Sequence, residues 1–139
     1  MARNLVIYSG QVTLPDAPEE YARKLDLFEF LKQMPATWDE SLSLNSKIGQ
    51  YITTARRNGD VWFVASVNDQ SKRTLDVKLD FLEEGMTYEA TIYQDSADAH
   101  GVSNAEAYEI RRSSVKRGDV IPAKMAVGGG HAMILKPVR

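Results

Sequence analysis

Residues 48–67 read IGQYITTARRNGDVWFVASV. Asn58-Gly59 stands between two runs that are rich in β-branched and aromatic residues, Ile48 to Arg57 and Val61 to Val67. The Asn-Gly pair readily takes the positive φ angles of a tight turn between antiparallel strands. The stretch therefore predicts a β-hairpin centred on Asn58-Gly59.

The same pattern extends from residue 47 to the end of the chain. Short apolar runs alternate with turn residues at a spacing of roughly 8 to 12 residues, which is typical of an all-β sandwich or barrel. Residues 75–81 show a period of two, which places apolar side chains on one face and charged ones on the other. Residues 35–139 are therefore predicted to form an antiparallel β-sandwich of about seven or eight strands, of Greek-key type.

The residues before Pro35 follow a different pattern. Apolar residues recur at intervals of three and four from Leu25 to Met34, and Pro35 supplies a stop. Pro18 suits the first turn of a shorter helix, where a missing N–H costs little. Residues 1–34 are predicted to be a helical segment distinct from the sandwich.

Composition excludes several classes of function. The 139 residues carry 17 basic and 19 acidic side chains, so the net charge of -2 gives no general attraction to nucleic acid or to anionic membranes. The absence of cysteine removes thiol nucleophiles, disulfides and thiolate metal sites. No apolar stretch approaches the roughly 20 residues of a membrane span, and no signal-peptide pattern opens the chain. We expect neither a nucleic-acid nor a membrane partner.

Two acidic pairs are candidates for general acid and base catalysis, Asp39 with Glu40 and Asp95 with Asp98. Asp39 and Glu40 follow Trp38 at the junction between the helical and strand patterns, where an acidic side chain more often caps a turn. Asp95, Asp98 and His100 could bind a cation, but they lack the spacing of a calcium loop. We interpret both groups as structural and expect no catalytic residue and no metal site.

We also interpret the triple glycine, the two histidines and the pairs of basic residues as structural. Gly128-Gly129-Gly130 has no Lys-Ser or Lys-Thr after it, so a turn between the last two strands is favoured over a phosphate-binding loop. His100 and His131 accompany no serine or zinc motif. Arg56-Arg57, Arg111-Arg112 and Lys116-Arg117 would alternate between strand faces, which favours solvent exposure and ion pairing over a phosphate-binding stripe.

Aromatic residues leave one alternative open. A ring standing out from the surface beside polar groups could stack on a sugar, and the candidates are Trp38, Trp62 and Tyr93. Core packing is the competing interpretation. The exposure of these rings decides between a carbohydrate-binding module and a purely structural domain.

A longer set of motifs now carries a resemblance. PATWDE at 35–40, IGQYI at 48–52, ARR at 55–57 and the triple glycine occur in one order along the chain. Together they resemble the C-terminal β-sandwich domain of glycoside hydrolase family 97, whose members are α-glucosidases and α-galactosidases. The resemblance covers roughly Asn4 to Val138.

The resemblance implies a non-catalytic accessory domain that supports a (β/α)₈ catalytic barrel. That barrel would hold the catalytic carboxylates and a calcium ion, so none is expected in this chain. Residues 1–34 look like the end of the barrel and its linker. Phe28, Phe30, Leu31 and Trp38 are expected at the packing between helix and sheet. Periplasmic or exported localisation is also implied, and glucoside and galactoside preferences both stay open.

The resemblance further implies that Leu5, Val6, Ile7, Val12 and Leu14 would pack on the barrel. In the isolated chain we expect this apolar segment, residues 5–14, to mediate a homodimer. An excised fragment and a free-standing chain remain alternatives at this point.

Overall fold

The computed structural model describes all residues except 8, 10, 12–16, 101 and 105. Three helices come first, followed by strands. The helices are α1 (Ala2–Val6), α2 (Pro18–Ala22) and α3 (Leu25–Gln33). The strands are β1 (Glu40–Lys47), β2 (Tyr51–Asn58), β3 (Val61–Asn68), β4 (Arg73–Lys78), β5 (Thr87–Asp95), β6 (Tyr108–Lys116), β7 (Val120–Met125) and β8 (Gly130–Pro137). No described helix is long and apolar enough to cross a membrane.

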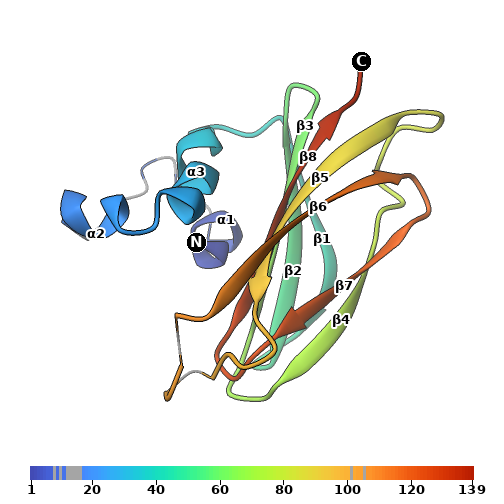
Figure 1. The fold of residues 1–139 in the computed structure, drawn as a ribbon. Coiled ribbons are helices and arrows are strands. Elements are labelled where there is room, and N and C mark those ends of the chain that lie inside the picture. The colour runs from blue at the N-terminus through green and yellow to red at the C-terminus, as the bar shows by residue number, and fades with distance from the viewer. Residues whose placement is uncertain (8, 10, 12–16, 101, 105) are drawn as a thin grey trace.

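The strands form two packed sheets, which confirms the predicted all-β sandwich. One sheet has six strands in the order β1-β2-β3-β8-β5-β6, and the other pairs β4 with β7. All strand pairs are antiparallel. The last strand, β8, returns to lie between β3 and β5, in the manner of a Greek key. Figure 1 shows the helices on one side of the sandwich, beside the six-stranded sheet.

The β2–β3 hairpin is confirmed, with its turn one residue later than predicted. Asn58 pairs with Val61, so Gly59 and Asp60 form the two-residue loop. Gly59 has a φ of 56°, and no described non-glycine residue has a positive φ. A glycine at the first loop position is the requirement of a type II′ turn, which explains why the turn centres on Gly59-Asp60.

The six-stranded sheet is buried on both faces at its centre. Trp62 and Val64 of β3 face the β4–β7 sheet and belong to a core of sixteen buried residues. Phe63 and Ala65 of the same strand face the helices and belong to a second core that includes Leu5 of α1 and Phe30 of α3. We call these the inter-sheet core and the helix-side core. Alternation along β3 therefore serves two cores.

A row of buried polar side chains crosses the inter-sheet face. Thr53, Ser66, His131 and Gln94 occupy successive register positions on β2, β3, β8 and β5. The Thr53 and Ser66 hydroxyls are 2.8 Å apart and hydrogen-bonded. His131 is fully buried, and neither of its ring nitrogens has a hydrogen-bond partner among the described residues. Burial, with a smaller effect of Arg111, lowers the pKa of His131 to about 4.

This imidazole makes stability sensitive to acid. In the unfolded chain His131 takes up a proton near its ordinary pKa of about 6.5, whereas the folded chain resists protonation until about pH 4. The contribution is fully present above about pH 6.5, and about 3 kcal/mol is lost as the pH falls to about 4. His131→Leu should remove this component of the pH dependence, which urea unfolding of both proteins across this range would measure. Parallel profiles for the two proteins would contradict the assignment.

The helix-side core predicts that two substitutions on α3 differ in their effect on the free energy of unfolding. Phe30 is fully buried, whereas Leu25 is 66% exposed. Phe30→Ala should lower the free energy of unfolding by about 3 to 5 kcal/mol. Leu25→Ala, the matched control on the same helix, should change it by less than about 0.5 kcal/mol. Urea denaturation measures both, and similar losses in the two variants would show that α3 does not form part of the core.

Candidate functional site

Three sets of contacts hold the helical segment on the sandwich. Arg56 of β2 donates from Nε to the Leu5 carbonyl at 2.9 Å and from Nη2 to the Val6 carbonyl at 3.3 Å. These carbonyls end α1 and have no partner within the helix, so a cation there is favourable. Arg56 was expected to point to solvent. The structure corrects this interpretation, because α1 lies beside β2 and β3 and brings its open carbonyls to the guanidinium.

The other two sets link the start of α3 to the end of the β5–β6 connection and to the first residue of β6. The Tyr108 hydroxyl donates to Asp26 at 2.8 Å, and Lys24 forms an ion pair with Glu106 at 3.1 Å. Lys24 also lies over the Tyr108 ring at 5.5 Å from its centroid. Residues far apart in sequence thus tie the helices to the edge of the sheet.

An aromatic cluster fills the space under α3. Phe30 meets Phe63 and Tyr93 edge to face, with centroid distances of 6.0 Å and 5.4 Å. Trp38 also meets Phe63 edge to face, with a centroid distance of 5.4 Å. The prediction that Phe30, Leu31 and Trp38 pack between helix and sheet is confirmed. Phe28 instead contacts Tyr21 of α2 at 4.9 Å.

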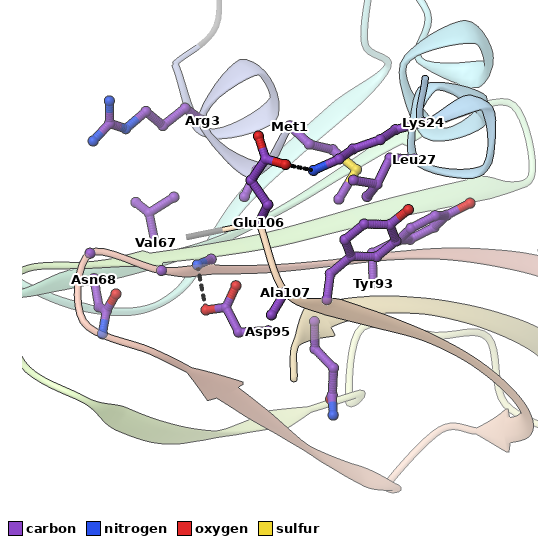
Figure 2. A pocket seen from close by; sticks show the side chains of 16 residues that line it. Met1, Arg3, Lys24, Leu27, Val67, Asn68, Tyr93, Asp95, Glu106 and Ala107 are labelled. Atoms are coloured by element: carbon purple, nitrogen blue, oxygen red, sulfur yellow. Dashed lines mark hydrogen bonds and ion pairs between the residues drawn. The ribbon is translucent and has the colours of Figure 1, made fainter. Parts of the chain in front are cut away.

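A cavity of about 480 Å³ lies between α1, the start of α3 and the neighbouring ends of β5 and β8. Figure 2 shows Arg3, Lys24 and Glu106 above it and Asp95 at its floor. Two cationic side chains (Arg3 and Lys24) and two anionic side chains (Asp95 and Glu106) line the cavity. Its other polar lining residues include Asn68, Tyr93 and Tyr108. The formal charges of the four charged side chains cancel, and the amino group of Met1 lies at the same cavity.

Asp95 at the floor anchors the triple-glycine turn. Its Oδ2 atom accepts hydrogen bonds from the Ala126 N–H at 2.8 Å and the Gly130 N–H at 3.2 Å. Burial raises the pKa of Asp95, and these two donors oppose the rise. The glycines connect β7 to β8, as predicted, with Gly128 at a φ of 64°.

The remaining acidic candidates have structural partners. Asp39 accepts a hydrogen bond from the Gly59 N–H at 2.7 Å, so it caps a turn, but that turn is the β2–β3 hairpin and not one at the junction between the helical and strand patterns. Asp98 accepts from the Ser96 hydroxyl at 2.6 Å, which is the main cause of its lowered pKa. Within the described part of the chain, no group of three or more acidic or histidine side chains is placed to hold a metal ion.

The three aromatic candidates do not share a surface. Trp62 is 4% exposed in the inter-sheet core, beside Phe81, and Tyr93 is 3% exposed in the helix-side core. Neither ring stands out from the surface as sugar stacking requires. Trp38 is half-buried, so a sugar contact through this residue stays a prediction.

Sequence reasoning missed most of the residues around the cavity, including Lys24, Asn68 and Glu106. The signal in the sequence was the stretch from Gln94 to Asn104, which is rich in Asp, Ala, Ser and Gly and long for a hairpin loop, because such loops often carry specific contacts. It pointed to the neighbourhood but not to the helix that the loop meets.

The hydrogen bonds from the Ala126 and Gly130 N–H groups to Asp95 predict that Gly129 tolerates no side chain. A Cβ atom there would lie 1.9 Å from Asp95 Oδ2 and 2.7 Å from the Ala126 nitrogen, so Asp95 would have to leave its donors. Gly129→Ala should destabilise the fold by about 3 kcal/mol. Gly130→Ala is the neighbouring control, since its Cβ would approach no atom closer than 3.1 Å. Thermal unfolding compares the two, and equal melting temperatures would refute the anchoring role.

One protein family and two curated proteins match this chain over most of its length. The family described as "Glycosyl-hydrolase 97 C-terminal, oligomerisation" matches residues 37–136. A retaining alpha-galactosidase of Bacteroides thetaiotaomicron is 37% identical over 136 residues, which cover 98% of this chain and 20% of that protein. A probable retaining alpha-galactosidase of Streptomyces bingchenggensis is 30% identical over 131 residues, covering 93% of this chain and 19% of that protein.

Solved structures agree with the sequence relatives. A glycoside hydrolase family 97 enzyme from Pseudoalteromonas sp. strain K8, in complex with panose, superposes with a TM-score of 0.86 at 33% identity. The match covers 89% of this chain and 20% of that one. A beta-arabinopyranosidase gives a TM-score of 0.74 at 27% identity, covering 96% of this chain and 20% of that one.

The chain thus spans about a fifth of the length of the relatives that it matches. Its motifs, its sandwich and its match over residues 37–136 agree with one another. The chain belongs to the glycosyl-hydrolase 97 C-terminal family and corresponds to the C-terminal accessory domain of glycoside hydrolase family 97 enzymes.

Proposed function

We propose that this domain acts in a longer α-glycosidase, where α1 to α3 form the seat for a catalytic barrel. The observation that carries the proposal is the asymmetry of the helices. The inner sides of α1 and α3 pack on the sheet, whereas Ile7, just after α1, and Leu25, the first residue of α3, are each 66% exposed. Large exposed apolar groups are typical of protein contact surfaces.

A groove between the helices supports the same role. It has a volume of about 460 Å³, and its apolar lining comes from Tyr21, Leu27, Phe28 and Leu31. Glu20, Arg23, Lys24 and Glu106 add charged groups to it. An apolar centre with a polar rim is the usual composition of a protein contact.

The activity of the longer protein is inferred from its relatives. Two of them are named as retaining or probable retaining alpha-galactosidases, and structures of a third are complexes with panose or acarbose. We propose that the parent hydrolyses α-galactosides or α-glucosides. The family resemblance alone supports a calcium ion in the barrel and export to the periplasm.

Self-association is a further part of the proposal, supported by the word "oligomerisation" in the family description. The expected dimer surface at residues 5–14 is only partly described. Leu5 is fully buried against the chain's own sheet, so it is not available for such a contact. Val12 and Leu14 lie outside the described residues.

The seat can be tested in the longer protein and in this domain side by side. Ile7→Asp and Leu25→Asp should leave the melting temperature of the isolated domain within about 2 °C, because both side chains are exposed. In the longer enzyme the same changes should shorten the half-life of α-glycosidase activity on heating by at least about threefold. Val120→Asp on β7 is the control, since Val120 is 49% exposed away from the helices.

The comparison has a clear negative outcome. If the two helix variants of the longer enzyme keep the wild-type half-life, the helices do not seat the catalytic domain. A loss of stability in the isolated domain would instead show that these side chains support the domain's own fold.

A further inference from the structure

The sandwich has four open strand edges, and they differ in charge. The outer strands are β1 and β6 of the large sheet, while β4 and β7 of the small sheet each have one free edge. A free edge presents unpaired backbone N–H and C=O groups, which can pair with another strand. Charged residues and proline on an edge discourage such pairing.

Three of the edges carry these deterrents. Strand β6 has four charged residues among nine, with Arg111 and Arg112 adjacent at its centre. Strand β7 contains Pro122, and β4 has charges at three of its six positions. Antiparallel pairing of β6 with itself about its centre would set Arg112 opposite Arg112 of a second copy, which is repulsive.

Strand β1 differs from the other edges. Its sequence is ESLSLNSK, so the six central residues, 41–46, carry no charge. Its charges stand at the two ends and have opposite sign, Glu40 first and Lys47 last. An antiparallel pairing of β1 with itself can place Glu40 opposite Lys47 of the second copy at both ends, which is favourable.

A bulge in β1 makes this register consistent with the faces of the sheet. In a regular strand, residues 40 and 47 would point to opposite faces, because faces alternate with a period of two. The register of β1 against β2 shifts between Ser43 and Asn45. As a result Glu40 pairs with Arg57 and Lys47 with Tyr51, two residues six apart on β2 that share one face.

The residues between Glu40 and Lys47 can be assigned to faces in the same way, from their partners on β2. Ser41 and Ser46 pair with Arg56 and Ile52 of β2, so they share the opposite face. Across the two-fold axis, Ser41 would lie opposite Ser46 of the second copy, and Leu42 opposite Asn45 of the second copy. The pairs Glu40–Lys47, Ser41–Ser46 and Leu42–Asn45 then each lie on a single face, as a continuous sheet requires, and only the bulge at Ser43 and Leu44 in the centre interrupts the alternation.

We propose that β1 is the self-association edge of this domain, pairing antiparallel with β1 of a second copy so that Glu40 meets Lys47 and Ser41 meets Ser46. The six-stranded sheet becomes continuous across both copies. The proposal rests on the proposed self-association but not on the seat for the catalytic barrel, which lies on the helices. Because the interface is isologous, it closes as a dimer.

The absence of cysteine allows a direct test by disulfide trapping. In the double variant Ser41→Cys/Ser46→Cys, each new thiol should face the other new thiol of the second copy. Mild oxidation should give a covalent dimer on a non-reducing gel, with two disulfides by mass spectrometry. Each single variant should give no covalent dimer on the same gel, because a residue does not meet its own copy in this register. Arg111→Cys/Ser113→Cys on β6 is the matched edge control and should not cross-link.

A second variant measures the charge pairing without new thiols. Lys47→Glu should raise the dimer dissociation constant at least tenfold in sedimentation equilibrium, because it opposes two acidic side chains at each end. Lys116→Glu on β6 should leave it unchanged. Thermal unfolding checks that each variant remains folded.

Three results would overturn the proposal. The first is a wild-type chain that stays monomeric up to about 1 mM. The second is a wild-type dimer whose dissociation constant ignores Lys47→Glu and whose β1 double variant fails to cross-link, which would assign the dimer to another surface. The third is preferential cross-linking of the β6 control.

Discussion

The antiparallel pairing of β3 with β8 is the constraint on which the rest of the structure depends. These strands form the centre of the six-stranded sheet, and each has a run of five buried residues. One face of the pair receives β4 and β7, and the other receives α1 and α3. A strand buried on both faces can be stable only when both layers are in place, because its apolar side chains otherwise face water. The helices and the sandwich are therefore expected to fold and unfold as one unit.

The contacts around the helices explain how a small domain can offer a rigid surface. Arg56 fixes the end of α1 through backbone carbonyls, and Asp26 and Lys24 fix the start of α3 to the β5–β6 connection. Asp95 holds the turn from β7 to β8 under the same region. Side chains that are locked by their neighbours lose little further entropy on binding, so a surface built on them is preorganised. Because these contacts fix α1 and α3 in place, the exposed side of these helices is held in place as well.

Sequence reasoning succeeded where the signal is local. The β2–β3 hairpin and the turn at the three glycines depend on residues close in the chain or on glycine's freedom at positive φ. It failed where the outcome depends on which layer covers a strand face. Trp62 and Tyr93 were candidates for exposed rings, yet each points into one of the two cores. Arg56 and the Tyr108–Asp26 bond could not be found either, since their partners lie 51 and 82 residues away in the sequence.

The two tryptophans allow the central claim to be measured directly, because Trp62 belongs to the inter-sheet core and Trp38 packs on the helix-side core. Urea unfolding of Trp38→Phe follows Trp62 fluorescence, and circular dichroism of the same sample follows the strands. The complementary variant, Trp62→Phe, pairs Trp38 fluorescence with circular dichroism in the same way. If β3 and β8 couple the two cores, the fluorescence and circular dichroism transitions coincide within each variant. A Trp38 transition at clearly lower urea than the loss of strand signal would contradict the account, because the helices would then leave an intact sandwich behind.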